Sequence, residues 1–205
     1  MTTDEAPNDD LSFLRNLAEA GQDAPLTMGP YLIAGGGWFG LASLVIGLAQ
    51  IGAIPSGANA VLWQPILIAF VGFAVTLFLL IRRERGRVQN TTNSTLGAAW
   101  SAVGWGIFFF FVAIFIVAAR TGEGYLLNSI SLVVLTLYAV AWKLSAAVSR
   151  KPWMNGIVFL TIVSLLTVAA SIGSMFSWLA YAAALLLSAV LPGFYLVSLA
   201  RKQQR

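Results

Sequence analysis

The stretch that decides the fold is VLWQPILIAFVGFAVTLFLLIRRERGR, residues 61–87. From Val61 to Ile81 it holds no charged side chain, and a run containing four arginines then closes it. An α-helix rises about 1.5 Å per residue, so an apolar stretch of this length crosses a hydrocarbon core of about 30 Å. Because the cytoplasmic ends of membrane spans are enriched in Lys and Arg, the arginine run also predicts on which side this helix ends.

The rest of the chain repeats this pattern. Its composition is 59% apolar and only 10% charged, with a mean hydropathy of +0.83, whereas soluble domains contain about 25% charged residues. These features predict an all-α integral membrane protein with six transmembrane helices. Short connections make neighbouring spans antiparallel, as three consecutive hairpins. The expected spans are 31–53, 61–81, 96–119, 126–147, 153–175 and 177–200.

Three regions follow from these spans. Residues 31–200 are expected to form the six-helix transmembrane bundle. Residues 1–30 are an acidic cytoplasmic arm with an amphipathic helix at about 10–20, and residues 201–205 are a basic cytoplasmic tail.

Lysine and arginine are distributed very unevenly across the bundle. Eleven of the twelve fall on one side, and only Arg120 falls on the other. The positive-inside rule therefore places both termini in the cytoplasm. The polar, acidic start of the chain is unlike a cleavable signal peptide. We therefore expect the protein to be integral to the cytoplasmic (inner) membrane of a bacterium.

Several kinds of chemistry are disfavoured by composition. The chain contains no Cys and no His, which removes thiolate sites and the commonest general base, metal ligand and haem ligand. No Asp or Glu lies inside an expected span, although proton relays and cation-coupled transporters place such residues there. Lys143 is the only charge within a span, and we expect it to snorkel to the cytoplasmic surface. The sequence thus predicts no enzyme activity, no catalytic residue, no cofactor, no metal and no nucleic-acid partner.

A stripe of small residues runs down the first span. Its members recur at helical spacing and are Gly36, Gly40, Ser43 and Gly47. In lipid, small residues allow two helix backbones to approach closely, so the stripe is a candidate helix-docking face for another membrane protein or a second copy. The other interpretation is packing against the chain's own helices.

Polar side chains gather near the outer ends of the spans. Those that could line an outward-facing pocket are Gln50, Gln64, Asn128, Ser131 and Ser174. Amides and hydroxyls carry no charge, so such a pocket would bind a neutral or zwitterionic small molecule or lipid by hydrogen bonding. The other interpretation is solvation of helix ends at the membrane surface.

The arm contains a candidate docking helix, and the last span contains a candidate hinge. In the arm, Leu11, Phe13, Leu14 and Leu17 lie on the apolar side of a helix whose polar side is acidic. Helices that lie on anionic lipid usually carry Lys and Arg, so we expect this one to dock onto protein, or else to be a short juxtamembrane helix without a regulatory role. Pro192 and Gly193 interrupt the sixth span and are a candidate hinge.

Aromatic side chains are expected to mark the membrane surfaces. Tryptophan prefers the headgroup level, and four residues fall near the basic ends of their spans: Trp38, Trp100, Trp142 and Trp153. Trp105 and Tyr138 lie deeper, where each is expected to need a polar partner inside the bundle or a water-lined cavity.

Three function classes remain open. The sequence favours a non-catalytic accessory or regulatory subunit that docks a partner through the small-residue face and the acidic helix. The alternative is a binding or transport subunit for a neutral or zwitterionic small molecule or lipid. An intramembrane enzyme is the least favoured class, because the chain lacks His, Cys and a buried carboxylate.

Overall fold

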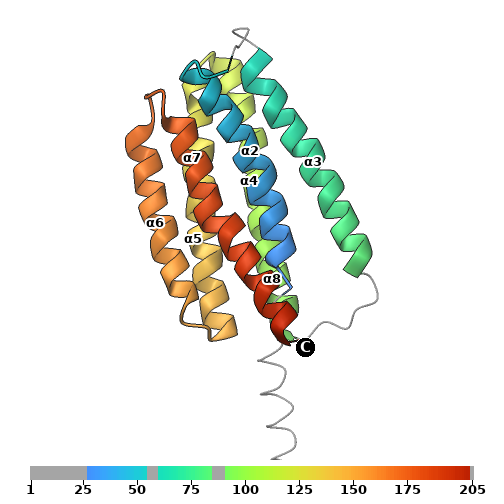
Figure 1. Ribbon diagram of the computed structural model, residues 1–205. Coiled ribbons are helices and arrows are strands. Elements are labelled where there is room, and N and C mark those ends of the chain that lie inside the picture. Colours follow the sequence, from blue (N-terminus) through green and yellow to red (C-terminus); the bar gives the residue numbers. More distant parts are fainter. Residues whose placement is uncertain (1–26, 55–59, 85–90, 204–205) are drawn as a thin grey trace, which may run out of the picture.

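The computed structural model describes residues 27–54, 60–84 and 91–203, and within these ranges the chain is helical and contains no strand (Figure 1). The bounds of the helices are α2 Gly29–Gln50, α3 Ala60–Glu84, α4 Thr91–Thr121, α5 Ser129–Ser149, α6 Met154–Ser171, α7 Ser177–Leu185 and α8 Leu191–Gln203. A short 3₁₀ turn, Gly124–Asn128, precedes α5, and a π-helical turn, η2, occupies Leu186–Val190 between α7 and α8.

Six helices in the described ranges are long and apolar enough to cross a membrane, by length and composition. The segment α7–η2–α8 counts as one of them, spanning Ser177–Lys202. The prediction of an all-helical protein with six candidate membrane spans is therefore confirmed.

Two spans differ from the prediction by four or five residues at one end, and the other bounds agree within three residues. The third span begins at Thr91 rather than 96, because the polar residues that precede the apolar run are also helical: Thr95 Oγ1 donates to the Thr91 carbonyl at 2.9 Å. The fifth span ends at Ser171 rather than 175, because Gly173 has a φ of +86°, which ends a right-handed helix. Hydropathy alone detects neither feature.

Positive charge gathers at one end of the bundle. This basic end, the lower end in Figure 1, carries the described residues Arg82, Arg83, Arg150, Lys151, Arg201 and Lys202. At the other end the chain turns with glycines in the left-handed conformation, Gly52 after α2 and Gly122 after α4, each with a φ of +76°. Such a turn needs glycine because a Cβ would be strained there.

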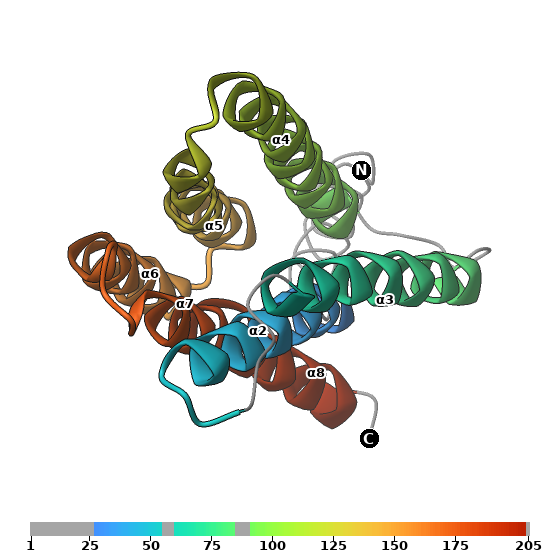
Figure 2. The same ribbon diagram turned by 90° about the horizontal axis from the view of Figure 1, so that it is seen from above.

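Helix α2 forms the centre of the bundle. It packs against α3 on one side and against α7, η2 and α8 on the other, while α5 packs between α4 and α6 (Figure 2). Two apolar clusters fill the interior, one at the basic end around Leu32, Trp142 and Met154, and one in the opposite half around Leu135, Val168 and Leu185.

The small-residue stripe of α2 faces the chain's own sixth span. A Cβ built on Gly36 would lie 2.7 Å from the Ala189 Cβ, and one built on Gly47 would lie 2.7 Å from Leu179. Gly40 faces Leu185, and Ser43 is buried. The structure thus places the stripe inside the bundle, as in the second of the two interpretations above.

Candidate functional site

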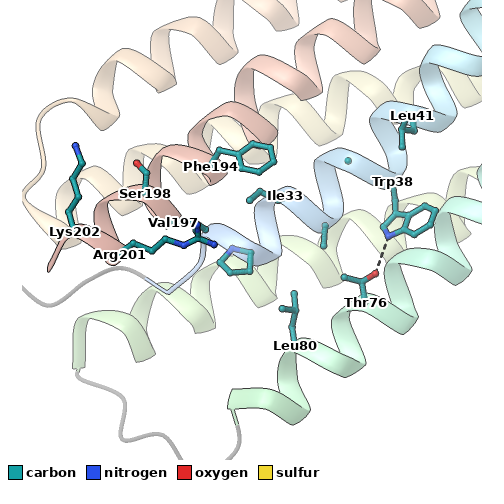
Figure 3. Close-up of a pocket in the computed structure, with 13 residues that line it drawn as sticks. Ile33, Trp38, Leu41, Thr76, Leu80, Phe194, Val197, Ser198, Arg201 and Lys202 are labelled. Carbon is teal, nitrogen blue, oxygen red and sulfur yellow. Dashed lines mark hydrogen bonds between the residues drawn. The ribbon is translucent and has the colours of Figure 1, made fainter. Parts of the chain in front are cut away.

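An open groove lies between α2, α3 and α8 in the described residues, with a volume of about 980 Å³ (Figure 3). It begins at the basic end and runs toward the middle of the bundle. Most of its lining is apolar, and two cations stand where α8 ends. The lining residues are Pro30, Ile33, Ala34, Gly37, Trp38, Leu41, Thr76, Leu80, Phe194, Val197, Ser198, Arg201 and Lys202.

A tryptophan holds α2 and α3 at a fixed distance on one side of the groove. Trp38 Nε1 donates to Thr76 Oγ1 at 3.0 Å, and Thr76 Oγ1 in turn donates to the Gly72 carbonyl at 2.7 Å. The indole lies so close over Gly72 that a Cβ there would be 2.6 Å from the ring. The indole N–H is therefore satisfied by α3, and the groove is left with the apolar part of Trp38.

Two glycines allow the backbones of α2 and α8 to pack closely on the other side of the groove. A Cβ on Gly29 would lie 2.9 Å from the Gly193 carbonyl oxygen, and a Cβ on Gly193 would lie 2.9 Å from the Gly29 carbonyl oxygen. Real Cβ atoms do not come this close to backbone, so both positions require glycine at this crossing. Gly193 was predicted as part of a hinge, and the structure shows it as a buried point of contact.

Pro192 lies two residues after the end of the π-helical turn η2, in the first turn of α8. Proline has no N–H, so the carbonyl four residues earlier, that of Ser188, cannot receive the usual helical bond. Trp142 of α5 replaces that donor: its Nε1 donates to the Ser188 carbonyl at 2.8 Å in the buried core. A π-turn relieves the clash between a proline ring and the preceding turn, and neighbouring helices often satisfy the freed carbonyl in membrane proteins. The break at Pro192 is thus tied to α5.

Tyr31 and Glu84 join α2 to α3 at the basic end. The Tyr31 hydroxyl donates to Glu84 Oε2 at 2.6 Å. In Figure 3, Arg201 extends from α8 toward the start of α2, close to the mouth of the groove. Arg82 and Arg83 lie in the last turn of α3 and are exposed, with Arg82 lying 6.0 Å from the centre of the Phe78 ring. Among the described residues that line the groove, the only charged side chains are the cations Arg201 and Lys202.

The five residues predicted to form an outer pocket lie at or near helix ends, and none of them lines the groove. Asn128 and Ser131 lie together at the start of α5. Gln50, Gln64 and Ser174 are exposed. Ser131 donates to the Asn128 carbonyl at 2.8 Å, and Ser174 donates to the Ser171 carbonyl at 2.7 Å. These hydroxyls are bonded within their own turns, as expected for polar residues that complete helix ends.

Buried hydroxyls inside the bundle follow the same rule. Ser145, Thr161 and Ser188 are fully buried, and each donates to the carbonyl one turn earlier, at 2.6–2.7 Å. Ser145 also accepts the indole N–H of Trp100 at 3.0 Å. No described residue leaves a buried side-chain nitrogen or oxygen without a partner.

The aromatic prediction was wrong for several tryptophans. Trp142 is fully buried, Trp100 stacks edge-on against it at 5.5 Å, and Trp38 lies in the groove, so these rings join helices rather than mark a membrane surface. Trp105 was expected to need a polar partner inside the bundle or a water-lined cavity. Its ring is instead 59% exposed on the surface of α4 and stacks on Phe109. Trp residues near a predicted span end look alike in sequence whether they point inward or outward.

Other predicted residues are placed as follows. Lys143 is exposed and donates from Nζ to Asn155 Oδ1 at 3.0 Å. The predicted arm, with Leu11, Phe13, Leu14 and Leu17, lies outside the described residues. No protein-family model matches the chain, and neither a curated protein nor a solved structure matches it.

Sequence reasoning missed the groove. Thr76 was the available signal, because it is the one hydroxyl within an otherwise apolar stretch from Ile66 to Ile81. The sequence pattern assigns Arg201 and Lys202 only to the basic end of the last span. What the sequence lacks is the crossing geometry of α2, α3 and α8, which brings these residues together.

We expect Trp142→Phe to lower the free energy of unfolding by about 1–3 kcal/mol, because it leaves the buried Ser188 carbonyl without its indole donor. Adding Pro192→Ala, which restores a backbone N–H at that position, should recover part of the loss. Thermal unfolding in mild detergent measures both effects. Trp105→Phe is the control, since that ring is 59% exposed, and it should change stability little. Equal losses in the two tryptophan variants would contradict this role for Trp142.

Proposed function

We propose that this protein is a non-catalytic accessory or regulatory subunit of a bacterial cytoplasmic membrane, which docks a partner membrane protein against α3 and α4. In this proposal its spans form three consecutive hairpins, and both termini lie in the cytoplasm. The acidic arm supplies a second, cytoplasmic contact to the partner.

The main support for this proposal is that the six spans are buried to very different extents. In the apolar windows of α3 and α4, 6% of the residues are buried, against 28–50% in the other four spans. Figure 2 shows the two helices extending away from the compact part of the bundle. Helices that contribute so little to their own chain's core are suited to contact another protein.

The exposed side chains of α3 and α4 are large. On α3 they form a continuous stripe of Leu67, Val71, Val75 and Phe78, exposed by 54–64%. On α4 the aromatic residues Trp105, Phe108 and Phe109 contact one another, with ring centres 5.5–5.9 Å apart. Aromatic side chains are enriched in protein interfaces, and a tryptophan N–H gains from a polar partner that lipid tails do not offer.

This proposal moves the docking surface away from the small-residue stripe. That stripe is already covered by α7 and η2 of the same chain. A partner helix could reach it only by displacing the sixth span.

Binding of a lipid or small molecule remains the second candidate function, and the groove between α2, α3 and α8 favours it. The groove and the exposed stripe of α3 lie on different sides of that helix. Both functions are therefore compatible in one protein.

Cross-linking in native membranes tests the docking surface. The chain has no Cys, so each introduced thiol is unique. We expect Val71→Cys, carrying a photoreactive maleimide, to cross-link to another membrane protein, because Val71 is 64% exposed on the proposed surface. Leu166→Cys on α6 is the matched control, since Leu166 is also 64% exposed. Mass spectrometry identifies the products.

A protein product from Val71→Cys but not from Leu166→Cys is the expected result. A product at twice the chain's own mass would show that the partner is a second copy. If both positions cross-link only to lipid, the docking proposal is wrong.

Thiol labelling of intact cells tests the orientation. We expect Gly124→Cys to react with a membrane-impermeant maleimide, because the basic end is proposed to face the cytoplasm and Gly124 is exposed at the other end, with no atom within 4 Å of an added Cβ. Lys202→Cys should react only after the membrane is permeabilised. Labelling in the reverse order would overturn the proposed topology.

A further inference from the structure

We propose that the groove between α2, α3 and α8 binds one anionic phospholipid from the membrane leaflet at the basic end. One acyl chain lies between the helices, and the phosphate lies beside Arg201 and Lys202. This goes beyond the proposed docking function and requires only that the bundle spans a membrane.

The groove has the depth of one leaflet. It is lined along α2 from Pro30 to Leu41, which is roughly 16 Å at the helical rise of about 1.5 Å per residue. Half of a hydrocarbon core of about 30 Å is about 15 Å. A ligand that fills the groove therefore reaches from the headgroup level to the middle of the bilayer, as a phospholipid acyl chain does.

The walls are suited to a hydrocarbon chain. Leu41, Leu80, Phe194 and Val197 supply apolar surface, and Trp38 adds a ring whose N–H is already bonded to Thr76. Gly37 lies in the groove lining, and a Cβ built there would meet no atom within 4 Å. The space above Gly37 is thus open, in contrast to the tightly covered Gly29 and Gly36.

The mouth is suited to a phosphate. Arg201 and Lys202 both line it, and Arg201 extends toward the start of α2 in Figure 3. The nearby carboxylate of Glu84 accepts a hydrogen bond from Tyr31. Arg82 and Arg83 add positive charge where α3 ends. Basic pockets between membrane helices bind anionic lipid headgroups, and a free phosphate would leave the long apolar wall uncovered.

Native mass spectrometry of the full-length protein in mild detergent tests the proposal. The protein is titrated with phosphatidylglycerol or with phosphatidylcholine of the same acyl chains. We expect one phosphatidylglycerol to bind more tightly than phosphatidylcholine. The double variant Arg201→Gln, Lys202→Gln should weaken phosphatidylglycerol binding roughly 30-fold, since each cation near a membrane surface contributes about fivefold. Its affinity for phosphatidylcholine should change little.

Two matched controls separate this site from general effects. Arg150→Gln with Lys151→Gln removes the same charge from the same end of the bundle, away from the groove, and should leave phosphatidylglycerol binding unchanged. Gly37→Leu should block the tight site by filling the open space, whereas Gly156→Leu, also in open space but on α6, should not.

Three results would overturn the proposal. The first is equal affinity of the wild-type protein for the two lipids. The second is an equal loss of binding in the groove variants and in their controls. The third is lipid binding that occurs only after residues 1–22 are deleted, which would show that the arm occupies the groove.

Discussion

Close contact between the backbone of α2 and the sixth span is the constraint on which the rest of the structure depends. Lipid tails are as apolar as leucine, so membrane helices gain little by hiding apolar surface from them and associate through close packing instead. Gly29, Gly36 and Gly47 leave no room for a Cβ against α8, η2 and α7 respectively. This contact runs the length of α2 and makes it the central helix. Helix α3 packs on α2 and α6 packs on α7, while α5 packs on α6 and α4 packs on α5.

The groove and the irregular turn both follow from this contact. At the basic end α8 must cross α2 where Gly193 meets Gly29, within the first turn after the π-turn ends at Val190. The freed carbonyl of Ser188 is satisfied by Trp142, which ties the crossing to α5. On its other side α2 is held to α3 by Trp38 and Thr76. The groove is the space left between α3 and α8, which both pack against α2.

Composition and hydropathy predicted much of the fold, because each apolar run carries its own evidence for a membrane span. The small-residue stripe and the break at Pro192 were also visible in the sequence. Their partners were not, because Gly36 meets Ala189 and Ser188 meets Trp142 across long intervals of chain. Two hydroxyls of the predicted outer pocket, those of Ser131 and Ser174, bond within their own turns, which the spacing in the sequence does not reveal. The groove depends on how three helices cross, which periodicity does not encode.

A single engineered disulfide tests the central contact most directly. A Cβ built on Gly40 lies 3.8 Å from the Leu185 Cβ, close to the mean separation of about 3.8 Å in disulfides. With Gly40→Cys and Leu185→Cys in one otherwise Cys-free chain, mild oxidation should form a disulfide within the monomer. Each single-Cys variant should remain monomeric under the same conditions. A disulfide that joins two chains, or none at all, would contradict the placement of α2 against its own sixth span.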